Sequence, residues 1–168
     1  FAMMLYPPCG SDGYNIIAKL EGTGEPLLFC AHLDTVTPGR GIRPVIGDGV
    51  IRSAGDTVLG ADDKSGVAAV METLHEIVEH NLPHRPVEVL FTVCEEVGLL
   101  GSKHADYSKI SAKEAVVLDS SMAGCIVNRA PAMVVLSVCI EGRAAHAAVD
   151  PKSGISAVKV AADAIAAI

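Results

Sequence analysis

The feature of this sequence that most constrains its fold is a series of short, almost wholly apolar runs, with one long helical pattern between the first and the second. The runs span residues 26–33, 87–94 and 115–118, and these lengths are typical of strands rather than helices. Strands that lack polar alternation are typical of sheets that are covered on both faces. The order of strand, helix and strand therefore predicts an α/β fold, with a sheet flanked by helices.

Residues 64–81 form the clearest helical pattern. Their apolar side chains recur every three or four residues and make one stripe: Val67, Val70, Met71, Leu74, Ile77 and Val78. A short strand is expected at 14–20, as the first element of the chain. A hairpin is expected at 43–53, where a Gly-Asp-Gly turn separates two apolar stretches. Together with the three apolar runs, these elements are assigned to one domain, residues 1–128.

From residue 129 onward the pattern changes. A long β-rich run at 133–141 is expected to be a strand, 142–154 a loop and 155–168 a helix. One strand and one helix cannot close a sheet by themselves. Residues 129–168 are therefore predicted to be the beginning of a second, incomplete domain, and the chain to be a piece of a larger protein.

Composition excludes several classes of protein. Half of the 168 residues are hydrophobic and 20% are charged, so the chain can bury enough surface to offset the entropy that it loses on folding. A formal net charge of −7 argues against binding to nucleic acid. No apolar run approaches the ~20 residues that a membrane-spanning helix needs. Neither nucleic acid nor a membrane is expected as a partner.

The cysteines indicate the compartment. There are five, an odd number without a C-x-x-C pair: Cys9, Cys30, Cys94, Cys125 and Cys139. Four of them lie in or beside apolar runs, which predicts buried free thiols. A reducing, cytoplasmic location is the expectation that follows.

Polar side chains follow each apolar run at the point where the predicted strand ends. The first run ends at His32 and Asp34, the second at Glu95 and Glu96, and the third at Asp119. Because the carboxyl ends of such strands meet at one edge of an α/β sheet, these side chains are expected to lie together. His32 and Asp34 are two residues apart, so both point to the same side of the strand, and Asp34 can orient the imidazole.

Two further carboxylates, Asp62 and Asp63, occupy the start of the predicted helix. Taken alone, either residue fits an ordinary helix cap, Glu95 and Glu96 fit a solvated strand end, and His32 fits a core histidine. Taken together, so many carboxylates at one edge would repel one another without cations. A carboxylate shared by two divalent ions ~3.5–4 Å apart is a common solution. Mixed histidine and carboxylate ligands favour zinc, with cobalt or manganese as alternatives.

Five motifs, in order and with matching spacing, resemble a known family. They are AHLDTV at 31–36, LGADDKSG at 59–66, FTVCEEVG at 91–98, LD at 118–119 and GRAAHA at 142–147. The chain resembles the di-zinc metallopeptidase and deacylase family that includes peptidase T, carboxypeptidase G and acetylornithine deacetylase. It is most similar to the peptidase T-like branch, the tripeptide aminopeptidases. This resemblance implies a zinc-peptidase-like catalytic domain with a mixed sheet, followed by the beginning of an α+β lid domain.

The resemblance also implies roles for individual residues. His32 and Asp119 would bind one metal ion, Glu96 would bind the other, and Asp62 would bridge the two. Asp34 would orient His32, and Glu95 would be the general base. His146, in the lid, would stabilise the oxyanion. The peptide bond between Asp62 and Asp63 would be cis. The family's fifth protein ligand, a histidine late in the chain, has no counterpart here. The isolated fragment is therefore expected to be inactive.

The expected reaction is hydrolysis of an amide bond in a short peptide by a water that the metals activate and Glu95 deprotonates. Two alternatives stay open. The first is an N-acyl amino acid deacylase or carboxypeptidase of the same family, since the metal-domain residues do not separate it from an aminopeptidase. The second is a non-catalytic relic that only binds or scaffolds. A homodimer that forms through the lid is the expected assembly.

Overall fold

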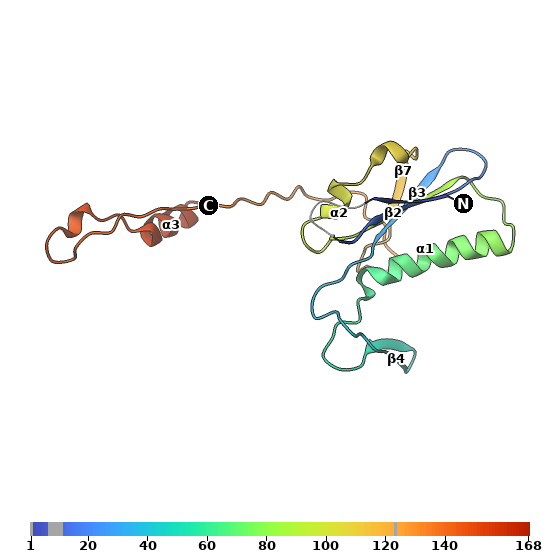
Figure 1. Ribbon diagram of the computed structural model, residues 1–168, viewed down its shortest axis with the longest axis horizontal. Coiled ribbons are helices and arrows are strands. Elements are labelled where there is room, and N and C mark those ends of the chain that lie inside the picture. The colour runs from blue at the N-terminus through green and yellow to red at the C-terminus, as the bar shows by residue number, and fades with distance from the viewer. Residues whose placement is uncertain (1, 7–11, 123) are drawn as a thin grey trace. The chain divides into compact units, whose positions relative to one another are not determined.

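The computed structural model describes residues 2–6, 12–122 and 124–168. Its contacts divide the chain into two units, Phe1–Cys125 and Ile126–Ile168. The first unit holds a five-stranded sheet and a long helix, shown in Figure 1. The expected α/β architecture is therefore confirmed for this unit.

The sheet has the strand order β1-β2-β6-β3-β7. Its strands are β1 Ala2–Tyr6, β2 Asn15–Leu20, β3 Leu27–His32, β6 Val87–Thr92 and β7 Glu114–Val117. Strands β1, β2 and β6 pair antiparallel, whereas β3 pairs parallel with both β6 and β7. The sheet is therefore mixed, as the resemblance implied. Strand β1 was not expected from the sequence, because the first element was predicted at 14–20.

Helix α1, Ala61–Glu79, covers one face of the sheet. Its buried side chains Val70 and Leu74 pack against Ala31, Val89 and Phe91. Met71 and Val78, which were expected on the same stripe, are more than half exposed. Val67 and Ile77 pack against the same cluster but are only partly buried, so the apolar stripe in contact with the sheet is narrower than predicted.

The opposite face of the sheet is covered by the segment that follows β6. This segment contains the short helix α2, Leu100–Lys103, and the 3₁₀ turn η1, Tyr107–Lys109. Ala105, Ile110 and Ala112 pack there against a smaller cluster formed by Ile17, Leu28 and Leu90.

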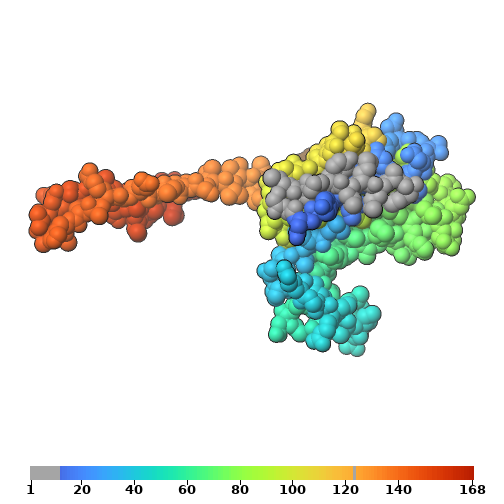
Figure 2. Space-filling model, viewed as in Figure 1, coloured from blue at the N-terminus to red at the C-terminus, as the bar shows by residue number. Residues whose placement is uncertain are grey.

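The expected hairpin is present as β4, Pro44–Gly47, and β5, Val50–Ser53. Its turn places Asp48 at φ +52° and Gly49 at φ +73°, the left-handed pair that two-residue hairpins favour. Seven of its eight strand residues are exposed, and the hairpin stands apart from the sheet in Figure 2.

In the second unit, the prediction of a strand at 133–141 is wrong. These residues have no regular structure, and the only pairing described nearby is a single bridge between Arg143 and Ile155. A strand exists only with a partner, and no described residue pairs with this run. The expected helix is confirmed as α3, Ala157–Ala166, whose N-cap Ser156 accepts a hydrogen bond from the backbone N–H of Lys159. That this unit begins a lid domain stays a prediction.

The thiols are less buried than the sequence suggested. Cys125 and Cys139 are exposed, and Cys30 and Cys94 are half-buried. Cys9 lies outside the described residues. In the described part of the chain, no helix has the length and apolar character needed to cross a membrane.

Candidate metal centre

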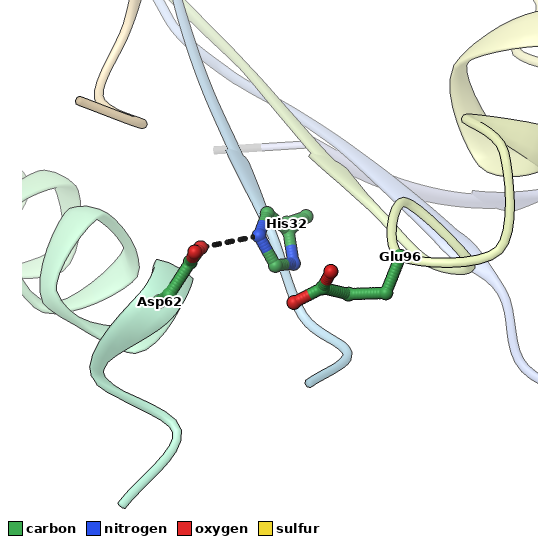
Figure 3. Close-up of side chains that lie close together, drawn as sticks. All are labelled: His32, Asp62 and Glu96. Carbon is green, nitrogen blue, oxygen red and sulfur yellow. Dashed lines mark hydrogen bonds and ion pairs between the residues drawn. The ribbon is translucent and has the colours of Figure 1, made fainter. Parts of the chain in front are cut away.

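The polar side chains that follow the strands meet at one edge of the sheet, as predicted. His32 is the last residue of β3 and is buried, with 3% of its surface exposed. Its Nε2 lies 2.9 Å from Oδ1 of Asp62, at the start of α1 (Figure 3). The peptide bond between Asp62 and Asp63 is cis, as the resemblance implied.

Two sets of side chains place potential ligand atoms within 4.8 Å of one another. One set is His32, Asp62 and Glu96, and the other is His32, Asp63 and Asp119. All four residues predicted as metal ligands are therefore in these sets, and Asp63 joins them. Glu95, the predicted base, belongs to neither set and lines a pocket beside them.

Asp63 is the residue that the sequence analysis did not single out as a ligand. It is buried, with 2% exposed, and its Oδ2 accepts a hydrogen bond from the backbone N–H of His32 at 3.2 Å. Its Oδ1 accepts one from the N–H of Gly66 at 3.1 Å, three residues further along the helix. The capping alternative therefore holds for Asp63. A Cβ at Gly66 would overlap the Asp63 carboxylate and crowd the carbonyl oxygen of Leu118, so this close approach requires glycine.

Asp34 contacts three parts of the site. Its backbone oxygen and its Oδ1 lie 3.0 and 3.5 Å from Nδ1 of His32. Its carboxylate also accepts hydrogen bonds from the backbone N–H groups of Glu95, at 3.0 Å, and Glu96, at 3.2 Å. This geometry suits the predicted orienting role and leaves Nε2 of His32 directed at Asp62.

The site concentrates negative charge. Burial, the largest influence on His32, lowers its pKa, but the hydrogen bond to Asp62 and the charges of Asp34, Asp119 and Glu95 together raise it. Burial raises the pKa of Asp63 and of Glu95, and nearby carboxylates add to the effect. Among the described residues, no Lys or Arg forms an ion pair with any of these carboxylates. A histidine nitrogen and several carboxylates without a Lys or Arg partner are the ligands that a divalent cation requires, so the residues fit a metal site.

Two pockets open beside the cluster. One of about 280 Å³ is lined by His32, Glu95 and Asp119, together with apolar side chains from the sheet. The other, of about 210 Å³, is lined by Asp62, Asp63 and Asp119. Asp119 lines both pockets, so a ligand in either one can reach the cluster.

His146 lies in the second unit, where it is exposed. Its Nδ1 accepts a hydrogen bond from the backbone N–H of Ala148 at 3.2 Å. Its role towards the oxyanion stays a prediction.

Comparisons with known proteins agree with these motifs. Residues 15–160 match the model of peptidase family M28. The uncharacterised protein YqjE of Bacillus subtilis is 42% identical over 159 residues, which is 93% of this chain and 43% of that protein. The crystal structure of aminopeptidase PepT from Bacillus cereus superposes with a TM-score of 0.76 at 36% identity, over 98% of this chain and 46% of that one.

A tripeptidase from Staphylococcus aureus gives a TM-score of 0.73 at 32% identity, over 92% of this chain and 42% of that one. These matches confirm the resemblance to the peptidase T branch. In each case, the chain spans less than half the length of the protein that it matches.

Proposed function

Because this chain belongs to peptidase family M28, we propose that the protein is a metal-dependent peptidase that releases residues from the N-terminus of short peptides. Two similar solved structures, an aminopeptidase and a tripeptidase, support this reaction. Short peptides are the proposed substrates and the cytoplasm is the proposed location. A homodimer that forms through the second unit stays a prediction.

One observation carries the proposal. Residues that lie up to 87 positions apart in the sequence, from His32 to Asp119, meet within 4.8 Å at the edge of the sheet, while Glu95 lies beside them without joining either ligand set. A separate carboxylate next to a set of metal ligands suits a general base. A site that only bound metal would not need it.

We assign the metal ligands as the resemblance to the family implies. His32 and Asp119 would hold one ion, Glu96 the other, and Asp62 would be shared between the two. Bound divalent ions, zinc in this proposal, would lower the pKa of a water molecule and polarise the carbonyl group of the substrate.

The side chains of the chain itself do the remaining work. Glu95 takes the proton from the attacking water and returns it to the leaving amine. Asp34 holds Nδ1 of His32, so that Nε2 stays directed at Asp62, where it would be free to bind a metal ion. Asp63 holds the backbone of His32 against the start of α1.

The proposal is tested by metal analysis and hydrolysis assays on the purified protein and on Glu95→Gln. The wild type is expected to contain zinc or another divalent ion, and the complete protein to hydrolyse a tripeptide. Glu95→Gln is expected to retain the metal and to lose at least ~10²-fold in kcat, because only the proton transfer is removed.

Glu72→Gln is the matched control, since Glu72 is an exposed glutamate on α1. It is expected to leave both metal content and rate unchanged. A wild type that binds no divalent ion would contradict the proposal. A protein that cleaves N-acetyl amino acids but no peptide would replace it with the deacylase alternative.

A further inference from the structure

The two glutamates of the site lie on a sharply folded turn between β6 and α2. The residues that flank them, Cys94 and Leu99, have φ values of +58° and +61°. Inside the turn, the carbonyl oxygen of Glu95 accepts hydrogen bonds from the N–H groups of Gly98, at 3.1 Å, and Leu99, at 2.9 Å. Non-glycine residues rarely adopt such φ values, so the surrounding structure must hold the turn in place.

A single buried side chain joins the two ends of this turn. Asn15, the first residue of β2, has no exposed surface. Its Oδ1 accepts a hydrogen bond from the backbone N–H of Val93 at 3.2 Å, just before the turn. Its Nδ2 donates to the carbonyl oxygen of Gly101 at 2.7 Å, just after it. Both polar groups of the amide are therefore used to hold the ends of the turn together.

The residue at position 101 shows how closely these ends approach. A Cβ there would overlap the carbonyl oxygen of Val93 and would lie 2.8 Å from Oδ1 of Asn15. Only glycine fits this close contact between residues 93 and 101. The Asn15 amide joins the same two residues by its hydrogen bonds. The middle of the turn is fixed separately, where Asp34 accepts the N–H groups of Glu95 and Glu96.

From this geometry, we propose that Asn15 is a positioning residue of the metal centre, which acts by holding the turn that carries Glu95 and Glu96. The side-chain hydrogen bonds described for Asn15 go to Val93 and Gly101 and not to the metal ligands or the base. It acts through the backbone, because the directions of the Glu95 and Glu96 side chains depend on where the turn begins and ends. The inference rests on the proposed function, since it assigns these two glutamates to the site.

The test measures zinc affinity in Asn15→Ala, by competition with a chelating dye, together with the visible absorption spectrum of the protein loaded with Co²⁺. We expect Asn15→Ala to bind Zn²⁺ about 10- to 100-fold more weakly than the wild type, as for other residues that support metal ligands. The Co²⁺ spectrum is expected to shift as well, because Glu96 is displaced. Amide hydrogen exchange at Glu95 and Glu96 in the metal-free protein is expected to become faster.

Leu74→Ala is the matched control, because Leu74 is a buried residue of α1 whose core cluster contains no residue of the turn. It lowers the stability of the fold without touching the turn, so its zinc affinity and Co²⁺ spectrum are expected to be those of the wild type. If Asn15→Ala does not fold, Asn15→Asp carries the same test, since it keeps an acceptor for Val93 and replaces the donor to Gly101 with a carboxylate oxygen that repels that carbonyl.

The outcomes separate the two proposals. A wild type that binds no Zn²⁺ removes the proposed function and this inference with it. A folded Asn15→Ala that binds Zn²⁺ as tightly as the wild type, or no more weakly than Leu74→Ala, overturns this inference alone. Weaker binding with a shifted Co²⁺ spectrum in Asn15→Ala, but not in Leu74→Ala, supports it.

Discussion

Strand β6 and the run at 133–141 are similar in sequence and differ entirely in structure. Both are rich in valine and leucine, and each contains one glutamate and no aspartate. All six residues of β6 are buried. In the run, by contrast, most of the large apolar side chains are about four-fifths exposed, as at Val135 and Leu136.

The difference lies in pairing and not in composition. Strand β6 pairs antiparallel with β2 on one side and parallel with β3 on the other. Among the described residues, the run at 133–141 has no strand beside it. A strand gains its stability from cross-strand contacts and burial, so β-propensity alone does not make one. An apolar run therefore forms a strand only where another strand lies beside it.

The same contrast separates the two regions that carry predicted functional residues. In the first unit, bonds over long sequence distances hold the site, such as those from Asp63 to His32 and from Asn15 to Val93. In the second unit, the described bonds of His146 reach only Ala148, Val149 and Asp150. Long-range bonds fix a side chain relative to a sheet, whereas local ones fix only a turn.

The sharpest test of this contrast places the same charge in both runs. Val89, in β6, is 1% exposed, whereas Leu136 is 81% exposed. We expect Val89→Asp to lower the free energy of unfolding by about 4 kcal/mol or more, because it buries an unpaired carboxylate. Leu136→Asp is expected to change it by less than about 0.5 kcal/mol. Urea unfolding measures both, and equal losses would contradict the comparison.

Removing a glutamate from each of the two runs is expected to give a smaller difference in stability. Glu88, in β6, is buried and bonded to Lys19 at 2.6 Å and to the N–H groups of Ser111 and Ala112. Glu88→Ala leaves Lys19 and these amides without their acceptor, and we expect a loss of about 3–5 kcal/mol. Glu141, at the end of the other run, is exposed, and Glu141→Ala is expected to have almost no effect. A loss below 1 kcal/mol in Glu88→Ala would show that this buried pair is dispensable.

The same glutamate predicts a pH dependence of stability. Burial alone would raise the pKa of Glu88, but hydrogen bonds from Lys19, Ala112 and Ser111 outweigh it and lower the pKa from 4.5 to about 2. A lowered folded-state pKa means that the stabilisation is complete above pH 4.5 and is lost as the pH falls towards 2. The loss is expected to be roughly 3 kcal/mol.

Unfolding with urea at a series of pH values measures this loss. Glu88→Gln, which cannot ionise, is the control and should show a shallower fall in stability over the same range. Parallel curves for the wild type and Glu88→Gln would mean that other carboxylates cause the acid sensitivity.

Much of the site was predictable, because most of its residues follow strands. The positions of His32, Glu96 and Asp119 follow from one rule, that the carboxyl ends of parallel strands share an edge, whereas Asp62 lies at the start of α1. That rule needs only the strand assignments, which the apolar runs supplied. The predicted and observed bounds of β2, β3 and β6 differ by two residues or fewer at each end.

The sequence could not show which distant residues a side chain or a strand contacts in the folded protein. Asn15 is an ordinary polar residue before a strand, and its role depends on Val93 and Gly101, about 80 residues away. Asp63 looked like a helix cap, which it is, but its second bond to His32 requires the tertiary fold. The strand predicted at 133–141 was wrong for the same reason, since no pattern within a run reveals whether a neighbour lies beside it.

The smallest expected effect concerns thiol reactivity and leaves stability untouched. Cys30 lies in β3, where burial raises the pKa of its thiol to about 11, whereas Cys139 lies exposed in the run at 133–141. Because the thiolate is the reactive form, we expect iodoacetamide at pH 8 to label Cys30 at least about 100-fold more slowly than Cys139. Peptide mapping by mass spectrometry distinguishes the two sites. In urea the difference should disappear, because unfolding removes the burial that protects Cys30. Equal rates in the folded protein would mean that β3 opens as readily as a run without partners, and the contrast between paired and unpaired regions would then fail at the strand that carries His32.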